Sequence, residues 1–343
     1  PYAFQARPWE LKKTESIDVF DAMGASIRID TRGKSVLRVL PRLNEEINEE
    51  WINDKSRFAI DGLSKQRLDK PYLKNEKKLE PTNWDVALQS IVNELKNRNP
   101  KNTMALSGNF SDIESLYSAK FFLHSLGSKY YDCRFDNAQF IEGHRSSYLF
   151  NSSIQDIDEA DAILLVGTNP RWEAAVLNAR IRKSYINNNC KIGLIGPKSD
   201  LTYEYDHISD NLSHLNDILV GESYFTDILQ NAKKPMIIIG TSAINFEGGQ
   251  DILRICSEIS NKYNITNETF NGLNILQQNI SRVGSLDIKF YNNNFDQNWN
   301  SSIKKHIDIN KPVVFLLDLD DIDLSILENA YVVYIGHHGD VAA

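Results

Sequence analysis

Apolar residues in the second half of the chain gather in short uniform runs rather than in alternating patterns. Each run is the length of a buried strand. Segments with helical spacing of apolar residues, at 171–186 and 250–263, lie between some of these runs. Buried strands separated by helices are typical of a parallel sheet that is covered on both faces. The pattern therefore predicts an α/β fold with Rossmann-like parallel sheet domains, and the expected strands lie at residues 161–167, 191–196, 234–240, 311–318 and 330–336.

The N-terminal segment has a different pattern. Residues 26–30 alternate between polar and apolar, a turn is expected at 31–34, and residues 35–40 form a second apolar-rich stretch. This pattern predicts a hairpin within a small β-rich lobe at residues 1–65. The α/β region is then expected to occupy residues 66–343, and its first helix begins after Asn83 as the N-cap and extends to residue 96.

Composition and charge exclude several classes of function. The chain has 343 residues, of which 41% are hydrophobic and 24% charged, as is ordinary for a globular protein. Its net charge of −8 argues against a nucleic-acid-binding surface. No apolar run approaches the roughly 18–20 residues that cross a bilayer, so no membrane span is expected.

The cysteines also limit the possibilities. Cys133, Cys190 and Cys256 are widely separated, and no C-x-x-C pair occurs, so neither a disulfide framework nor a cysteine-rich zinc site is expected. A reducing compartment such as the cytosol or the mitochondrial matrix fits this usage. The chain also has no G-x-S-x-G, P-loop or G-x-G-x-x-G motif.

Two loops at predicted strand ends contain candidate ligand-binding residues. Thr168, Asn169 and Arg171 follow one strand and open a helix, a position that suits an anion. The simpler interpretation, that the flanking glycine and proline only turn the chain, is favoured. His337 and His338 follow the last strand, but adjacent residues tend to point apart and no further ligand is spaced for zinc. We interpret them as part of a loop that could line the same crevice, and His144 and His207 as structural residues.

Several segments in combination resemble one known family. The chain is similar to the molybdopterin-oxidoreductase-like region of the large iron–sulfur subunit of respiratory complex I, of the mitochondrial 75 kDa type. The segments that carry the resemblance span nearly the whole chain and include P-Y-A-F-Q-A-R-P-W-E (1–10), V-L-P-R-L-N-E-E-I-N-E-E-W (39–51), E-A-D-A-I-L-L-V-G-T-N-P (159–170), N-A-R-I-R-K-S (178–184) and G-H-H-G-D-V (336–341).

The resemblance places four residues where related proteins have the cysteines of a 4Fe-4S cluster. These residues are Asp18, Asp21, Ala25 and Asn53, and the sequences that flank them match the cluster signature on both sides. An iron–sulfur cluster needs thiolate ligands, with rare histidine replacements. The resemblance thus implies that the cluster is lost, that these positions hold no metal, and that the pocket has become a packed, hydrogen-bonded junction.

A molybdenum ligand would be expected in the loop at residues 132–140. Cys133 is the thiol in that loop, and it lies slightly upstream of the position where such a ligand would align. We interpret it as a free buried cysteine. The crevice formed by Thr168, Asn169, Arg171, His337 and His338 is then expected to hold no cofactor.

The resemblance implies a place in the matrix arm of complex I, on the matrix side of the mitochondrial inner membrane. Because the chain has neither the cluster thiolates nor a convincing molybdenum ligand, we expect its role there to be structural and non-catalytic. That complex passes electrons from NADH to ubiquinone. The implied partners are other matrix-arm subunits and the rest of the iron–sulfur subunit itself. In the family, modules with one 2Fe-2S and two 4Fe-4S clusters lie upstream of the position of Pro1, and the α/β region continues beyond the last residue here. A segment of a longer chain, or one product of a split gene, is therefore expected.

Two alternatives remain open on the sequence. The first is an active molybdenum or tungsten enzyme that uses a pterin cofactor and has lost only its iron–sulfur cluster. The second is a binding module for a small ligand that reuses the crevice near residues 168–171 and 337–340.

Overall fold

The computed structural model describes residues 4–75, 78–292, 295 and 298–339. The chain forms two compact units, each assembled from two separate segments. Unit 1 comprises Pro1–Asp61 and Ala138–Ile280, and unit 2 comprises Gly62–Asn137 and Ser281–Ala343. Among the described residues, no helix is long and apolar enough to cross a membrane.

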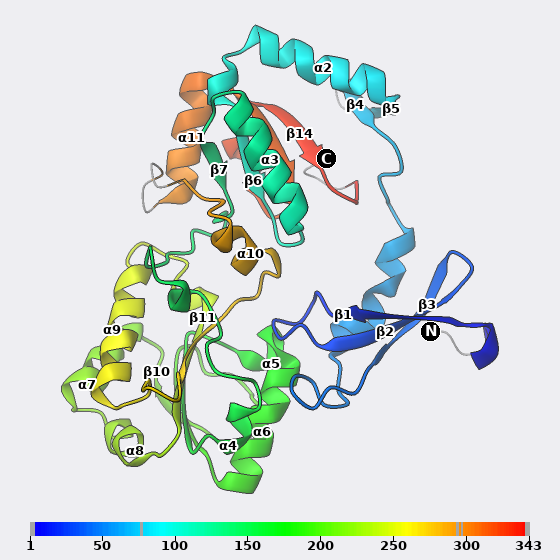
Figure 1. The fold of residues 1–343 in the computed structure, drawn as a ribbon. Helices are drawn as coiled ribbons and strands as arrows, with labels where there is room; N and C mark the ends of the chain where they lie inside the picture. Colours follow the sequence, from blue (N-terminus) through cyan, green and yellow to red (C-terminus); the bar gives the residue numbers. More distant parts are fainter. Residues whose placement is uncertain (1–3, 76–77, 293–294, 296–297, 340–343) are drawn as a thin grey trace. The chain divides into compact units, whose positions relative to one another are not determined.

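An antiparallel sheet forms the N-terminal lobe of unit 1. Its strands are β1 (Lys12–Ile17), β2 (Ser26–Arg32) and β3 (Ser35–Pro41), paired in that order (Figure 1). The predicted hairpin is confirmed by the β2–β3 pair, and Gly33 turns it with a positive φ of 61°. After the sheet, the chain enters the short helix α1 (Asp54–Phe58) and a 3-10 turn at Ala59–Ser64.

The rest of unit 1 is a five-stranded parallel sheet in the order β10-β9-β8-β11-β12. Helices α4 and α6 cover one face, and α7, α8 and α9 cover the other (Figure 1). Ile163 and Leu165 of β8 pack with Leu177 and Ile181 of α6 in one buried core. The elements are α4 (Asp156–Glu159), β8 (Ala162–Val166), α5 (Pro170–Glu173), α6 (Ala175–Asn188), β9 (Lys191–Ile195), β10 (Asp206–Ser209), α7 (Leu215–Val220), α8 (Phe225–Asn231), β11 (Pro235–Gly240), α9 (Gly249–Lys262) and β12 (Leu273–Leu276).

One prediction for unit 1 is wrong, because a helix expected to be continuous is divided into two. The pattern at 171–186 indicated a single helix, whereas the structure has α5 and α6 separated at Ala174, whose φ and ψ of −151° and 73° are not helical. The helical spacing of apolar residues continues across Ala174, so the sequence pattern does not indicate the break. Its cause lies in contacts from the N-terminal lobe and from Glu173, which are described below.

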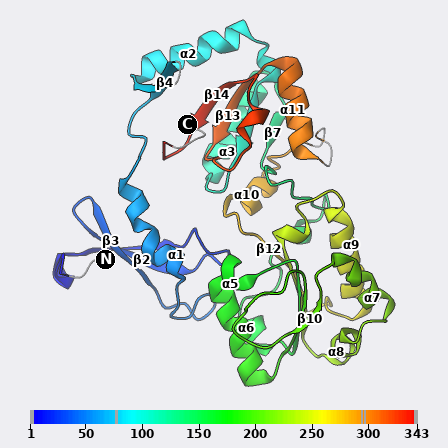
Figure 2. The same cartoon turned by 180° about the vertical axis from the view of Figure 1, so that it is seen from behind.

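Unit 2 contains a second parallel sheet, with four strands in the order β14-β13-β6-β7. Figure 2 shows β13 and β14 side by side, and α3 and α11 lie on opposite faces of the sheet. Trp299 and Ile303 of α11 fill the core on one face, and Phe122 of α3 meets Phe315 edge to face on the other. The elements are β6 (Met104–Ser107), α3 (Ile113–Ser125), β7 (Tyr130–Asp132), α10 (Ser281–Asp287), α11 (Trp299–Asn310), β13 (Val313–Leu317) and β14 (Tyr331–Ile335).

The first segment of unit 2 precedes this sheet. It comprises the hairpin of β4 (Tyr72–Asn75) and β5 (Lys78–Pro81), followed by α2 (Trp84–Asn97). Asn83 is the N-cap of α2, because its side chain accepts a hydrogen bond from Val86 N–H over 2.9 Å. This confirms the predicted helix start.

Candidate functional site

The four residues at the former cluster positions lie together in unit 1. Asp18 follows β1, Asp21 and Ala25 lie in the turn before β2, and Asn53 is the N-cap of α1. All four are buried. The β1–β2 pairing brings the two ends of the turn together, and Asp18 N–H donates to the Ala25 carbonyl over 2.8 Å.

Side-chain hydrogen bonds join three of these positions. The Asn53 amide donates to Asp18 Oδ2 over 2.8 Å and to Asp21 Oδ2 over 3.4 Å. The Ser56 hydroxyl donates to Asp18 Oδ1, and Ser56 N–H donates to Asn53 Oδ1 over 2.8 Å. Sequence reasoning missed Ser56, which lies one helical turn after Asn53 in the matching D-K-S-R-F segment. The expected packed, hydrogen-bonded junction is present.

The turn itself is built by the two aspartates. Asp18 Oδ1 accepts a hydrogen bond from Phe20 N–H over 2.9 Å, and Asp21 Oδ1 accepts one from Met23 N–H over 3.0 Å. An aspartate that binds the backbone two residues later mimics a backbone turn. Gly24 has φ of +62°, a conformation that residues with a Cβ rarely adopt. Both carboxylates thus have local structural partners.

These residues do not fit a 4Fe-4S cluster. Carboxylate, amide and methyl groups replace the thiolates that iron in such a cluster requires. The polar side chains are also already bonded to one another and to the turn. Within the described parts of the chain, no group of three or more His, Cys, Asp or Glu side chains is arranged to hold a metal ion.

Asp21 and Asp30, two of the buried aspartates of the lobe, have opposite electrostatic environments. Burial raises the pKa of Asp21, and the nearby Asp18 carboxylate adds to this, against hydrogen bonds from Met23, Val176 and Asn53. Burial also acts to raise the pKa of Asp30, but Arg28 and Arg38 outweigh it and lower that pKa. Asp30 therefore forms a compensated ion-pair cluster, whereas Asp21 has no cation among these partners.

The loop after β8 contains the predicted residues Thr168, Asn169 and Arg171. Hydrogen-bond donors of Thr168 and Asn169 already bind the carboxylate of Glu173, which belongs to the same loop. Thr168 Oγ1 donates to Glu173 Oε2 over 2.6 Å, and Asn169 N–H donates to Glu173 Oε1 over 3.0 Å. Arg171 is bound to Asp200 instead, with 2.6 Å between Nη1 and Oδ2. Sequence reasoning missed Glu173, which takes the position expected for an external anion.

The carboxyl ends of β8 and β11 are also packed too closely for a ligand to bind between them. In this sheet β8 leads to β9 on one side, and β11 leads to β12 on the other, so a ligand would be expected between the carboxyl ends of β8 and β11. A Cβ added at Gly240 would lie 2.4 Å from the Gly167 carbonyl oxygen. Ser242 Oγ also donates to that carbonyl. Backbone and Glu173 therefore fill this edge, and the residues present do not fit the phosphates of a pterin dinucleotide.

His337 and His338 lie in unit 2, so they are considered apart from the β8 loop. Their Nδ1 atoms are 2.6 Å apart, so the expectation that they point apart is wrong. His338 Nε2 contacts the Gly62 carbonyl over 2.8 Å, and His337 Nε2 lies 3.8 Å from Asp318 Oδ1. These contacts fold the loop back onto its own unit. Asp340 of the same motif lies outside the described residues.

Cys133, the thiol nearest to an expected molybdenum ligand, is free and buried, as predicted. Burial raises its pKa to about 12, even though the nearby Arg282 guanidinium opposes the shift. A thiol with such a pKa is protonated near neutral pH and is a poor nucleophile. A free buried cysteine of this kind behaves as a small hydrophobic residue in the packing of the core.

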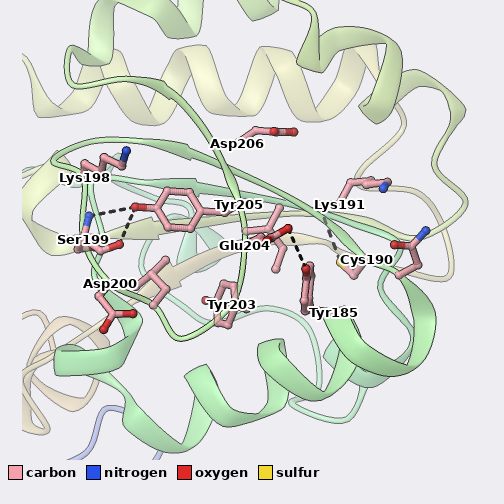
Figure 3. Close-up of a pocket in the computed structure, with 13 residues that line it drawn as sticks. Tyr185, Cys190, Lys191, Lys198, Ser199, Asp200, Tyr203, Glu204, Tyr205 and Asp206 are labelled. Carbon is pink, nitrogen blue, oxygen red and sulfur yellow. Dashed lines mark hydrogen bonds between the residues drawn. The ribbon is translucent and has the colours of Figure 1, made fainter.

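The structure also contains a cavity that the sequence did not indicate. It has a volume of about 610 Å³ and is lined mainly by the segment that joins β9 to β10 (Figure 3). Tyr205 OH binds the backbone of Ser199 in both directions, at 3.0 Å from its nitrogen and 2.6 Å from its oxygen. Burial raises the pKa of the lining Cys190 thiol to about 12. The hydrogen bonds of Tyr205 therefore hold the segment between β9 and β10 in place. The Cys190 thiol is not an activated nucleophile.

A second set of contacts joins the N-terminal lobe to helix α6. The side chain of Arg180 is only 2% exposed. Its Nε donates to the Ile47 carbonyl over 3.0 Å, Nη1 donates to Asp158 Oδ2 over 2.8 Å, and Nη2 donates to the Glu45 carbonyl. Lys183 also binds Asp158, over 3.1 Å. Sequence reasoning gave Arg180 no role beyond its place in the N-A-R-I-R-K-S segment, because its partners are distant in the sequence.

Two family models match the chain, one over its N-terminal lobe and one over the α/β region that follows. Residues 67–343 match the family model described as molybdopterin oxidoreductase. Residues 11–61 match the model described as NADH-ubiquinone oxidoreductase NDSU1/NuoG-like, 4Fe-4S domain. The second match contains the four positions that lack thiolates.

Curated relatives align over the whole chain. The mitochondrial 78 kDa subunit of NADH-ubiquinone oxidoreductase from Neurospora crassa is 44% identical in an alignment of 353 positions that covers 100% of this chain and 46% of the relative. The Candida albicans protein of the same name is 42% identical and is covered to 47%. A NADH-quinone oxidoreductase subunit from Rickettsia bellii is 40% identical and is covered to 49%. The chain spans about half the length of these relatives.

Among solved structures, acetylene hydratase from Pelobacter acetylenicus is similar in fold. The TM-score is 0.66 at 12% identity, and the match covers 95% of this chain and 61% of the other. At this identity the likeness concerns the fold alone. The two family models and the curated relatives show that the chain belongs to the molybdopterin oxidoreductase family and carries an N-terminal segment of the NDSU1/NuoG-like 4Fe-4S type.

Proposed function

We propose that this chain is a structural, non-catalytic segment of the large iron–sulfur subunit of respiratory complex I. The identities of 40–44% over the whole chain to subunits of NADH-ubiquinone and NADH-quinone oxidoreductases support the membership. The structural role rests on one observation above all. Asn53 binds Asp18 and Asp21, and Ser56 binds Asp18, so polar side chains at three of the four former cluster positions now hold the lobe together.

On this proposal the chain belongs to the peripheral arm, on the matrix side of the mitochondrial inner membrane, and contacts other subunits of that arm. The fungal relatives named as mitochondrial support this location. The electron-carrying clusters of the parent subunit, one 2Fe-2S and two 4Fe-4S, would be held by its segment upstream of Pro1. Residues 1–65 would form the lobe of the former cluster, residues 66–343 would form the α/β region, and that region would continue further in the parent subunit.

The vestigial crevice residues Thr168, Asn169, Arg171, His337 and His338 then bind no cofactor. Glu173 supports this for the loop after β8, because its carboxylate already accepts the hydrogen bonds of Thr168 and Asn169. An active pterin enzyme would need those donors for its own anionic cofactor. No observation favours that alternative.

Copurification tests the proposed membership. The parent protein is given an affinity tag at its natural locus, and detergent-solubilised mitochondria are separated on native gels. We expect the tagged polypeptide to comigrate with NADH:ubiquinone oxidoreductase activity and to be captured together with the other peripheral-arm subunits. A tagged protein that runs free of that activity, in cells whose complex I is intact, would contradict the proposal.

A further inference from the structure

Helix α6 begins without a cap of its own. The residue at its N-cap position is Ala174, which has no side chain to accept a hydrogen bond. The first N–H groups of a helix have no partner within the helix, and a buried N–H without a partner is costly. Val176, in the first turn of α6, is buried, so water cannot readily replace the missing acceptor.

The acceptor comes from the turn between β1 and β2, residues 18–25, which holds three of the former cluster positions and is called the former cluster turn below. Asp21 Oδ2 lies 3.4 Å from Val176 N, and the geometry is that of a hydrogen bond. A carboxylate at this end of a helix also interacts favourably with the helix dipole. The other bonds of Asp21, from Met23 N–H and the Asn53 amide, hold the carboxylate in place. Asp21 thus stands where an N-cap side chain would, although it is distant in the sequence.

Two further contacts from the lobe reach the residues just before α6. Ala22 N–H donates to the Glu173 carbonyl over 3.4 Å, and Lys55 Nζ donates to the Trp172 carbonyl over 2.8 Å. Glu173 is also the residue whose side chain binds Thr168 and Asn169. The former cluster turn and the loop after β8 are therefore joined through the break between α5 and α6.

We propose that Asp21 is an N-cap supplied to α6 from the N-terminal lobe, and that through it the former cluster turn positions the loop Thr168–Glu173. A residue at a lost cluster position thereby acquires a positioning role. The loop that would face an anionic cofactor is held in its closed, Glu173-bound form by the same junction. This inference does not depend on membership of complex I, because it concerns only contacts within unit 1.

Amide hydrogen exchange, resolved to single residues by mass spectrometry, tests the inference on the whole chain. In Asp21→Ala, we expect exchange at Val176 to rise roughly fivefold, the size expected for a lost N-cap. Exchange across residues 168–173 should rise with it. The variant Asp21→Asn keeps the size of the side chain but offers one acceptor oxygen in place of two. It should raise exchange in the same two segments by a smaller factor.

The matched control is Asp112→Ala, which removes the N-cap of α3 in unit 2. It should raise exchange near Ser115 and leave residues 168–178 unchanged. Unchanged exchange at Val176 in both Asp21 variants would overturn the inference. So would a rise at Val176 without one at 168–173, since the coupling would then be absent. A rise at 168–178 in the control would show that the response is not specific to Asp21.

Discussion

Replacing Arg180 with methionine is expected to lower the unfolding free energy of unit 1 by about 3–5 kcal/mol, the usual cost of removing one partner from a buried ion pair. The guanidinium donates to two backbone carbonyls of the lobe and to the Asp158 carboxylate of α4. Methionine fills much of the volume but donates no hydrogen bond, so the acceptors at Glu45, Ile47 and Asp158 lose a buried partner. Urea denaturation followed by circular dichroism measures the loss.

The matched control for this substitution is Arg182→Met. Arg182 lies on the same helix and is exposed, where its guanidinium binds the Thr202 carbonyl. Surface substitutions of this kind usually change stability by no more than about 0.5 kcal/mol. If the two variants lost equal stability, Arg180 would not be the buried link between the lobe and α6.

Replacing Gly108 with alanine is expected to destabilise unit 2 by the upper end of the roughly 1–3 kcal/mol typical of overpacking, or more. Gly108 follows β6, and a Cβ at this position would lie 1.8 Å from the Asp318 carbonyl oxygen after β13. Both groups belong to the backbone, so relief requires the ends of β6 and β13 to separate. Because these strands flank the point where the order of the sheet reverses, the result reports directly on the edge where a ligand would bind.

Gly284→Ala is the control within unit 2. Gly284 lies in α10, and its nearest atom to an added Cβ is on the flexible Ile113 side chain, 3.7 Å away. Alanine favours a helix over glycine by up to about 1 kcal/mol, so this variant should match or exceed the parent stability. Equal urea midpoints for the two glycine variants would mean that the strand ends of unit 2 are not in close contact.

The sequence predicted the strands that lie in short, predominantly apolar runs. β8, β9, β11, β13 and β14 fall within the predicted ranges. β6 and β7 were missed because runs of four and three residues are too short to give a periodic signal. Helix α3 was missed as well, because Tyr117 and Phe121 on its exposed side blur the amphipathic pattern.

The candidate site was predictable in its positions but not in its partners. The flanking residues located Asp18, Asp21, Ala25 and Asn53, yet no local pattern tells which donors their side chains meet. Ser56 contacts Asp18, and Val176 contacts Asp21, through the tertiary structure, because each pair is far apart in the sequence. Tertiary contacts of this kind also set the break at Ala174, which periodicity cannot reveal.

Glycine contacts illustrate the same limit. Gly167 and Gly240 were recognisable as strand ends, and a glycine at a strand end is compatible with either a ligand cradle or a closed edge. The closed edge is indicated only by the structure, in which a Cβ added at Gly240 would lie 2.4 Å from the Gly167 carbonyl oxygen. The absence of thiolates, in contrast, could be concluded from the sequence, because it depends on residue type and not on geometry.

We propose that this chain keeps the framework of a redox enzyme without its metals. The direct measurement is the iron and molybdenum content of the chain purified without oxygen, combined with electron paramagnetic resonance after reduction. We predict only substoichiometric traces of either metal and no signal from a 4Fe-4S cluster. Stoichiometric iron with such a signal, or stoichiometric molybdenum released together with a pterin, would contradict the account.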